Sequence, residues 1–291
     1  MQYHFPVTSQ HQFSCSTCMA KKRICIIAKT YPCPSVKYDE LVCTAGVTET
    51  GKWIRLYPIP FRKLDFDQQY SKFNWVEADI ERNTKDFRPE SYRLTASQAI
   101  KIVGHIDTDA NGTWATRRDL LLKNVYDDLG KLIADAKDPQ KKTSLAVFKP
   151  TKMVDFIAKE CASREWKKST LDSIKARALQ VDLFAGAQNP FDVVKKIPFK
   201  FSYTFEDSNG KQSTLEIIDW EIGQLFRKCI NNGEQQAIGK VRQKYWNDFA
   251  LTKDIYLILG TTLAYHAKNA PNPFLIIGVF PPKFELQQRF L

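Results

Sequence analysis

Several features that would reveal a location or an activity are missing from this sequence of 291 residues. No apolar run approaches the roughly 20 residues that a membrane helix needs. The longest, Ile24–Ala28 and Phe274–Phe280, are the size of strands. Residues 1–18 lack a basic segment followed by an apolar one, so we expect no secretory signal. These absences predict a soluble protein of the cytoplasm.

Catalytic motifs are missing as well. The sequence holds no GxSxG, GxGxxG or HExxH pattern and no phosphate-binding P-loop. It has only four histidines, and His105 and His266 fit surface or hydrogen-bonded positions better than the role of a general base. We therefore predict a binding protein, not an enzyme, and one without a cofactor.

Cysteine use points to a reducing compartment. The seven cysteines are an odd number, which excludes complete internal pairing, and Cys25 lies in an apolar run that suits a buried thiol. Cys15 and Cys18 form a CxxC motif, but a structural zinc site normally needs four ligands, and no second such pair follows. The sequence predicts a flexible tail over residues 1–20 and no bound metal.

Positive charge is in excess along the whole chain. There are 43 Lys and Arg against 32 Asp and Glu, a net charge of +11. Residues 1–150 contribute about +6 and residues 151–291 about +5, so the excess is not a detachable basic tail. A basic surface attracts polyanions at long range, which makes nucleic acid the leading candidate partner.

The expected elements divide the chain into two similar halves. Residues 21–150 and 151–291 each contain strands, a hairpin, a helix and closing strands, and the first hairpin turns at Gly51. The apolar spacing over 116–136 predicts one helix. Short strands with few helices between them are typical of small, partly open barrels such as the OB-fold. We therefore predict an α+β fold of two OB-like small β-barrels with intervening helices, one in each half, the second with a helical insertion.

Aromatic and basic side chains alternate over residues 52–63. Trp53, Arg55 and Tyr57 share one face of a predicted strand, and Ile54 and Leu56 share the other. Bases stack on aromatic rings while Arg and Lys follow phosphates, although the same rings could also belong to a core. A second basic stretch lies in a predicted helix, where a solvated face would explain its charges equally well. The candidate nucleic-acid-binding residues are Trp53, Arg55, Tyr57, Arg62, Lys63, Trp75, Arg82, Arg88, Arg93, Lys240, Arg242 and Lys244.

Asp219-Trp220-Glu221 is the acidic cluster that most resembles part of a nuclease site. A two-metal site needs several converging carboxylates, and the sequence identifies no third. The competing interpretation is that Asp219 caps a helix over residues 220–230, with Glu221 in its first turn and Trp220 in the core.

Several segments resemble a poorly characterised prokaryotic family with a dual OB-containing domain. They are Lys22–Tyr31, Trp53–Arg62, Glu81–Arg93, Asp219–Glu221 and the stretch from Leu259 to Gly278. The resemblance implies two OB-like barrels and contact with nucleic acid, but no established reaction. Some members of that family carry Cys and His around the second hairpin. The turn 206–210 has neither, so this sequence departs from the family's metal-binding pattern at that turn.

Together these features predict a non-enzymatic nucleic-acid-binding adaptor or sensor of a prokaryotic system, linked to mobile elements or phage defence. A partner protein subunit is compatible with this role. The alternatives are a metal-dependent nuclease that uses Asp219 and Glu221, and a protein–protein scaffold whose basic face meets an acidic partner.

The zinc prediction can be tested directly. We expect elemental analysis of untagged protein to find no stoichiometric zinc, because no four-ligand set is present. About one zinc per chain would contradict this and would point first to Cys15 and Cys18.

Overall fold

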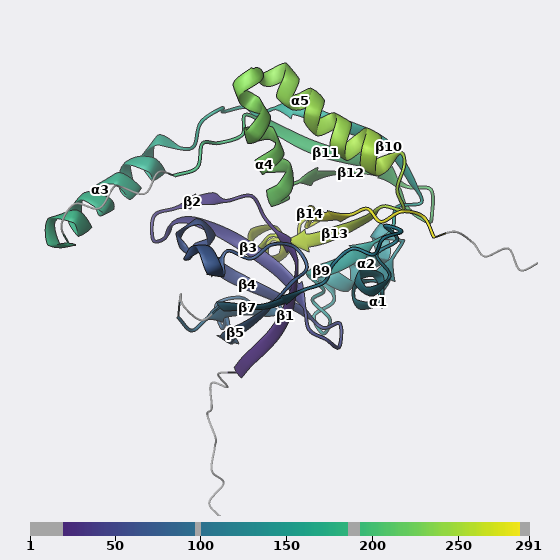
Figure 1. Ribbon diagram of the computed structural model, residues 1–291, viewed down its shortest axis with the longest axis horizontal. Coiled ribbons are helices and arrows are strands. Elements are labelled where there is room, and N and C mark those ends of the chain that lie inside the picture. Colours follow the sequence, from purple (N-terminus) through teal and green to yellow (C-terminus); the bar gives the residue numbers. More distant parts are fainter. Residues whose placement is uncertain (1–19, 97–99, 186–192, 286–291) are drawn as a thin grey trace, which may run out of the picture.

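The computed structural model describes residues 20–96, 100–185 and 193–285 (Figure 1). The Cys15/Cys18 motif and most of the predicted tail therefore lie outside the described residues. Within them, no helix is both long enough and apolar enough to cross a membrane. The architecture is mixed α+β and contains two seven-stranded sheets.

Five strands of the first sheet form a closed barrel. They follow the order β1-β3-β4-β6-β5, and β5 pairs back onto β1. The pair β4–β6 is parallel and the others are antiparallel. Strand β2 (Cys33–Ser35) pairs with β3, and β7 (Ile100–His105) pairs with β5. The barrel strands are β1 (Ala20–Lys29), β3 (Asp39–Val47), β4 (Trp53–Ile59), β5 (Asn74–Arg82) and β6 (Ser91–Leu94).

Local sequence patterns explain this barrel. Ile54 and Leu56 of β4 are buried in its core, as predicted from their alternation. Gly51 has a φ of 81° in the turn between β3 and β4, which confirms the predicted hairpin. Two short 3-10 turns, η1 (Phe61–Lys63) and η2 (Phe66–Gln68), connect β4 to β5.

The second sheet follows the order β10-β11-β12-β14-β13-β9-β8. Its first five strands repeat the strand order of the barrel, including one parallel pair, β12–β14. The strands are β8 (Val125–Tyr126), β9 (Leu145–Phe148), β10 (Lys152–Glu160), β11 (Phe199–Glu206), β12 (Gln212–Ile217), β13 (Tyr256–Thr261) and β14 (Phe274–Phe280).

The second sheet is open in the described residues, unlike the predicted barrel. Closure would need β10 to pair with the free edge of β13, as β1 pairs with β5 in the first sheet. That edge of β13 is occupied by β9, with Leu257 opposite Phe148 and Gly260 opposite Leu145. The first sheet ends with β7 and the second begins with β8, so the chain passes from one sheet to the other before residue 150. The domain division at residue 150 stays a prediction.

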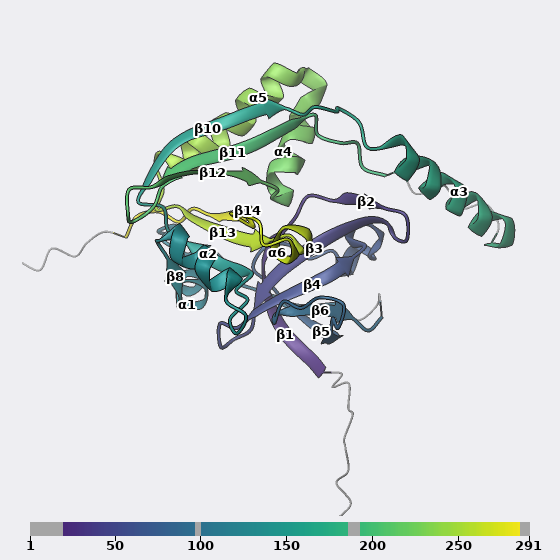
Figure 2. The ribbon, with the colours of Figure 1, turned by 180° about the vertical axis from the view of Figure 1, so that it is seen from behind.

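Helices cover parts of the second sheet and the junction between the sheets (Figures 1 and 2). The single helix predicted over 116–136 is two helices, because the chain turns after Leu122 to form β8 beside β9. Helix α3 (Lys168–Ala185) projects away from the rest of the chain. The remaining helices are α1 (Ala115–Leu121), α2 (Leu129–Lys137), α4 (Trp220–Cys229), η3 (Ile230–Asn232), α5 (Glu234–Arg242), the π-helix η4 (Gln243–Ala250) and α6 (Leu263–Ala267).

An apolar core joins the two sheets. Ile27 and Ala28 of β1 belong to one buried cluster with Ile258 of β13 and Ile277 of β14. A Cβ on Gly278 would lie 3.0 Å from the Cβ of Ala28, so the two backbones approach closely there. The sheets therefore share a core, in addition to the core that each has of its own.

Two glycine substitutions test this packing with opposite expected signs. In Gly46→Ala the new Cβ would meet Ile24 Cγ2 at 2.5 Å and the Cys25 carbonyl oxygen at 2.6 Å. We expect it to lower the free energy of unfolding by about 1–3 kcal/mol, as overpacking does. Gly239→Ala in α5 meets nothing within 4 Å and should raise it by about 1 kcal/mol. Urea denaturation measures both, and equal effects would contradict the described packing.

Candidate nucleic-acid interface

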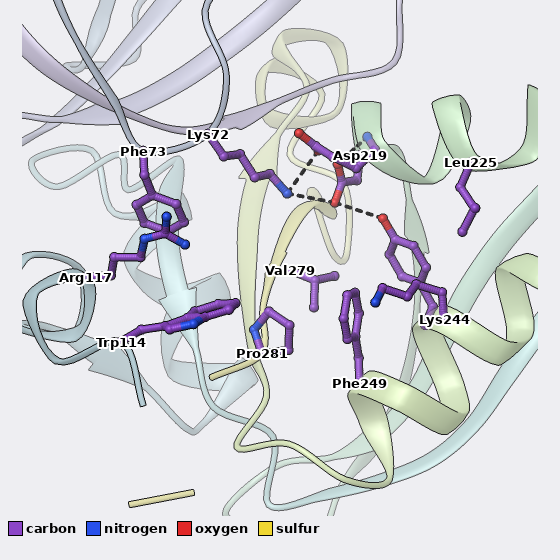
Figure 3. Close-up of a pocket in the computed structure, with 12 residues that line it drawn as sticks. Lys72, Phe73, Trp114, Arg117, Asp219, Leu225, Lys244, Phe249, Val279 and Pro281 are labelled. Carbon is purple, nitrogen blue, oxygen red and sulfur yellow. Dashed lines mark hydrogen bonds and ion pairs between the residues drawn. The ribbon is translucent and has the colours of Figure 1, made fainter. Parts of the chain in front are cut away.

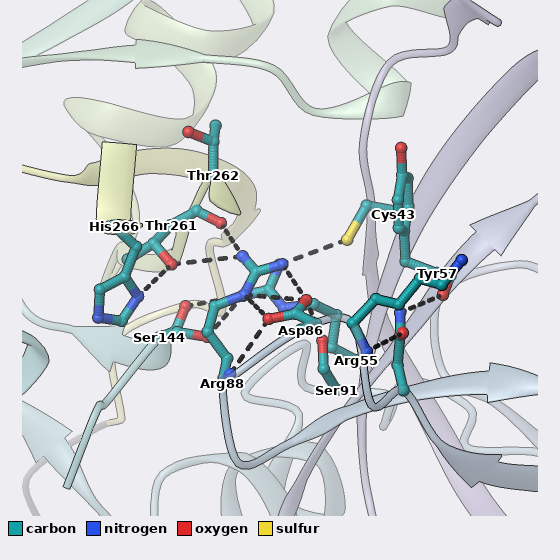
Figure 4. Close-up of polar contacts among 12 residues, drawn as sticks. Cys43, Arg55, Tyr57, Asp86, Arg88, Ser91, Ser144, Thr261, Thr262 and His266 are labelled. Atoms are coloured by element: carbon teal, nitrogen blue, oxygen red, sulfur yellow. Dashed lines mark hydrogen bonds and ion pairs between the residues drawn. The ribbon is translucent and has the colours of Figure 1, made fainter. Parts of the chain in front are cut away.

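The β4 face that holds Trp53, Arg55 and Tyr57 is covered at its centre by the second sheet. Arg55 is 2% exposed, and its Nη2 donates to the Ser144 carbonyl oxygen and to Ser144 Oγ, both at 2.9 Å (Figure 4). Its Nη1 lies 3.4 Å from Cys43 Sγ. The prediction that Arg55 lies on an open strand face is therefore wrong, because the start of β9 packs over that face.

Arg88 is buried at the same junction. It is 4% exposed, holds Asp86 through Nε and Nη2, and donates from Nη1 to the Thr261 carbonyl oxygen at 2.7 Å (Figure 4). Burial opposes ionisation of Asp86, but hydrogen bonds from Arg88 and Ser91 outweigh it and lower the pKa of Asp86 to about 2. Arg88 thus joins the sheets, and its burial contradicts the exposure that its predicted role in binding nucleic acid requires.

The other predicted residues of the first barrel are spread over several environments. Trp53 and Trp75 are half-buried, and the guanidinium of Arg23 lies 4.9 Å from the Trp75 ring centre. Arg82 donates to the carbonyl oxygens of Arg88 and Ser91. Four of the predicted residues of the first barrel are exposed: Tyr57 near the end of β4, Arg62 and Lys63 on η1, and Arg93 on β6.

The three predicted residues of the second unit lie on α5 and η4. Lys240, Arg242 and Lys244 are all exposed. Arg242 Nη1 donates to the Phe156 carbonyl oxygen of β10 at 2.6 Å, so it helps to hold the helix on the sheet. Lys244 Nζ lies 4.9 Å from the Phe249 ring centre.

The structure places Arg62 and Lys63 of η1 near other basic residues that were not among the predicted candidates. Arg62 lines a cavity of about 350 Å³ with Lys195, Lys196 and Arg227, and Glu234 is the one carboxylate among its described lining residues. We call the following set the basic surface: Arg62, Lys63, Arg177, Lys195, Lys196 and Arg227.

Buried carboxylates and backbone groups hold the basic surface in place. Asp39 pairs with Lys63 and Arg177, and Glu40 pairs with Arg62 at 2.7 Å. Glu40 also accepts from the Val194 backbone N–H at 3.1 Å, which ties the segment next to Lys195 to the first barrel.

Arg227 adds a second tie between the barrel and this segment. Its Nη2 donates to the Lys195 carbonyl oxygen at 2.7 Å and to Tyr31 Oη at 2.5 Å. Burial raises the pKa of Tyr31 to about 12, although Arg227 opposes this, so the phenol stays protonated at neutral pH. The basic surface therefore has a fixed frame, and its members come from four separate parts of the sequence.

Asp219 and Glu221 lie at a second cavity, of about 420 Å³, between the two units (Figure 3). Asp219 Oδ1 accepts from the Glu221 backbone N–H at 2.9 Å, which confirms that Asp219 caps α4. Lys72 Nζ lies 3.1 Å from Asp219 Oδ2 and 3.0 Å from Glu221 Oε2. We call this cavity the junction pocket.

The protonation of this triad follows from its burial. Burial raises the pKa of Asp219 well above its usual range, and the neighbouring Glu221 adds to this while Lys72 opposes it. Burial also opposes ionisation of Glu221, but Lys72 and Asp219 outweigh it and lower its pKa to about 2. No group of three His, Cys, Asp or Glu suited to a metal occurs among the described residues. The ammonium of Lys72 lies against both carboxylates.

The junction network gives a stability prediction. In Arg88→Ala the buried Asp86 loses its charge partner, and we expect a loss of about 3–5 kcal/mol in the free energy of unfolding. The matched variant Arg93→Ala breaks an exposed pair with Glu81 and should change it by about 1 kcal/mol or less. Chemical denaturation compares the two, and similar losses would show that Arg88 does not stabilise the junction.

Comparison with known proteins gives matches to two family models, neither of which describes an activity. Residues 20–123 match a family described as "Domain of unknown function (DUF8758)". A search of curated proteins finds no match. Among solved structures, the p204 HINb domain gives a TM-score of 0.30 at 10% identity, over 68% of this chain and 75% of that one. The tetrameric p202 HIN2 gives 0.29 at 9%, over 68% and 70%. Neither likeness is close enough to establish a shared fold. Residues 127–291, more than half of the sequence, match "Domain of unknown function (DUF8757)", and the chain belongs to that family.

Proposed function

We propose that this protein binds nucleic acid at the basic surface and catalyses no reaction there. The observation that carries the proposal is the cavity lined by Arg62, Lys195, Lys196 and Arg227, in which Glu234 is the one carboxylate among the described lining residues, while Glu40 pairs with Arg62. Clustered cations of this kind neutralise phosphates and release counterions, which is the main source of sequence-independent affinity for nucleic acid.

The strand order of the barrel supports the proposal. A closed order of β1-β3-β4-β6-β5 with one parallel pair is the arrangement of an OB-like barrel. OB-folds bind oligonucleotides on the face of the second and third strands and on the loops that join strands one to two and four to five. Those strands are β3 and β4 here, and η1 with Arg62 and Lys63 directly follows β4. The basic surface therefore adjoins the position at which such barrels bind their ligand.

Burial of Arg55 and Arg88 restricts where a bound nucleic-acid strand can lie. The centre of the β4 face is under β9, whereas Tyr57 near the end of β4 is 38% exposed. We infer a path from Tyr57, whose ring can stack on a base, over η1 to the segment that holds Lys195. The second sheet repeats the same strand order and forms a second, opened OB-like unit in this proposal.

The proposal extends to biological role through the family resemblance. A cytoplasmic adaptor or sensor subunit in a prokaryotic system, with a link to phage defence or mobile elements, suits a protein that binds polyanions without altering them.

Salt dependence provides the first test. We expect fluorescence anisotropy to show that the protein binds single-stranded oligonucleotides with little sequence preference and that affinity falls steeply with salt. Each neutralised phosphate contributes about −0.7 to the log–log slope, so five contacts give roughly −3.5. Absence of binding at about 50 mM salt would refute the proposal, since electrostatic attraction is strong there.

A pair of charge reversals then locates the site. Lys195→Glu should weaken binding and make the salt slope shallower by about 1 or more, because one cation of the surface becomes an anion. Lys211→Glu changes the net charge equally, but Lys211 lies beyond the other end of the eight-residue strand β11. Equal losses in the two variants would mean that overall charge, and not the basic surface, determines binding.

A further inference from the structure

The two walls of the junction pocket have unusual backbone conformations. Phe73 and Trp114 line one side with φ values of 63° and 60°, which bulky residues rarely adopt. The other side is formed by η4, a π-helix of eight residues that supplies Lys244, Tyr245 and Phe249. Strained residues and π-helical segments both concentrate at functional sites. Here they face the same cavity (Figure 3).

Cations lie beside the aromatic rings of this pocket. The guanidinium carbon of Arg117 is 4.0 Å from the Phe73 ring centre and 5.2 Å from that of Trp114. Its Nε and Nη2 donate to the Ile106 carbonyl oxygen, which fixes its plane. Lys244 on the opposite wall keeps a side chain that is 52% exposed. The pocket thus offers ring faces together with two cations from different units.

The Lys72 triad forms the polar part of the lining. Both oxygens of Asp219 are occupied, by the Glu221 N–H on one side and by Lys72 and Tyr245 Oη on the other. Glu221 also lines the pocket, and its side chain is 38% exposed. Because Lys72 and Asp219 lower its pKa to about 2, Glu221 is a carboxylate at neutral pH, and the oxygen that does not face Lys72 can accept a hydrogen bond from a ligand.

From this geometry we propose that the junction pocket binds one nucleotide whose base carries an exocyclic amino group. The volume of about 420 Å³ suits such a ligand. The base would stack against Trp114 and Phe249, and its phosphate would meet the exposed ammonium of Lys244. Carboxylates accept from the N4 amino group of cytosine, and uracil has a carbonyl oxygen at that position, which Glu221 would repel. This site is separate from the basic surface, so either can fail without the other.

Titration calorimetry of the full chain with mononucleotides tests the pocket. We expect CMP to bind roughly tenfold or more tightly than UMP, the discrimination typical of one good polar contact to a base. Cytidine should bind more weakly than CMP, since it lacks the phosphate. No heat from CMP, AMP or GMP at about 1 mM, or equal affinities for CMP and UMP, would overturn the proposal.

Variants separate the proposed contacts from folding. Trp114→Asn removes the stacking ring, and Asn tolerates a φ of 60° better than Trp does, so the fold should survive. We expect it to weaken CMP binding by roughly tenfold. Glu221→Gln should abolish the preference for CMP over UMP. Lys244→Ala should reduce CMP binding to that of cytidine, while its control Lys240→Ala, which lies outside the pocket lining, should leave it unchanged. Unaltered CMP affinity in both Trp114→Asn and Lys244→Ala would refute the assignment.

The nucleotide can be free or part of a bound strand, and competition distinguishes the two sources. If CMP displaces a labelled oligonucleotide, the pocket takes a base of the strand. If the two bind together, the pocket takes a free nucleotide. Either result, with the variant effects above, supports the pocket, and oligonucleotide binding to Lys195→Glu reports separately on the basic surface.

Discussion

Two buried guanidinium groups determine how the sheets of this protein sit against each other. Arg55 reaches Ser144, and Arg88, with Asp86 beside it, reaches Thr261. A charge removed from water is tolerated only when hydrogen bonds replace its hydration. Any rotation of one sheet over the other would break these bonds while leaving the charges buried. The apolar contact between β1 and the pair β13–β14 favours association in general, whereas the guanidinium groups select one arrangement.

Both candidate sites follow from that arrangement. The basic surface needs Arg62 from the barrel and Lys195 and Arg227 from the second unit, and the junction pocket needs rings and cations from both. Neither site exists in one half alone. Covering the centre of β4 removes one possible binding face, and the same packing event assembles two others from residues that are far apart in the sequence.

Local patterns predicted part of this structure. The predictable features are the core positions of Ile54 and Leu56, the hairpin turn at Gly51 and the cap of α4 at Asp219. They could be predicted because each depends on neighbours within a few residues. The alternation of apolar and polar residues shows which face of a strand lies in the core, but not what covers the other face. The burial of Arg55 could therefore not be predicted from it. The opening of the second sheet depends on β9, which is distant in sequence from β13. A cluster such as the basic surface, held through the long-range pairing of Glu40 with the Val194 N–H, leaves no local pattern to detect.

Strand β9 has a consequence for how ligands are recognised. It is four residues long, yet it follows directly on Ser144, which holds Arg55, and pairs with β13 along its length. One short segment therefore fixes the barrel and the second sheet to a common frame before any ligand arrives. A ligand that touches both units meets a preorganised surface and loses little free energy to ordering the protein. Differences in affinity between related ligands should then arise mainly from their dissociation rates, while their association rates are similar.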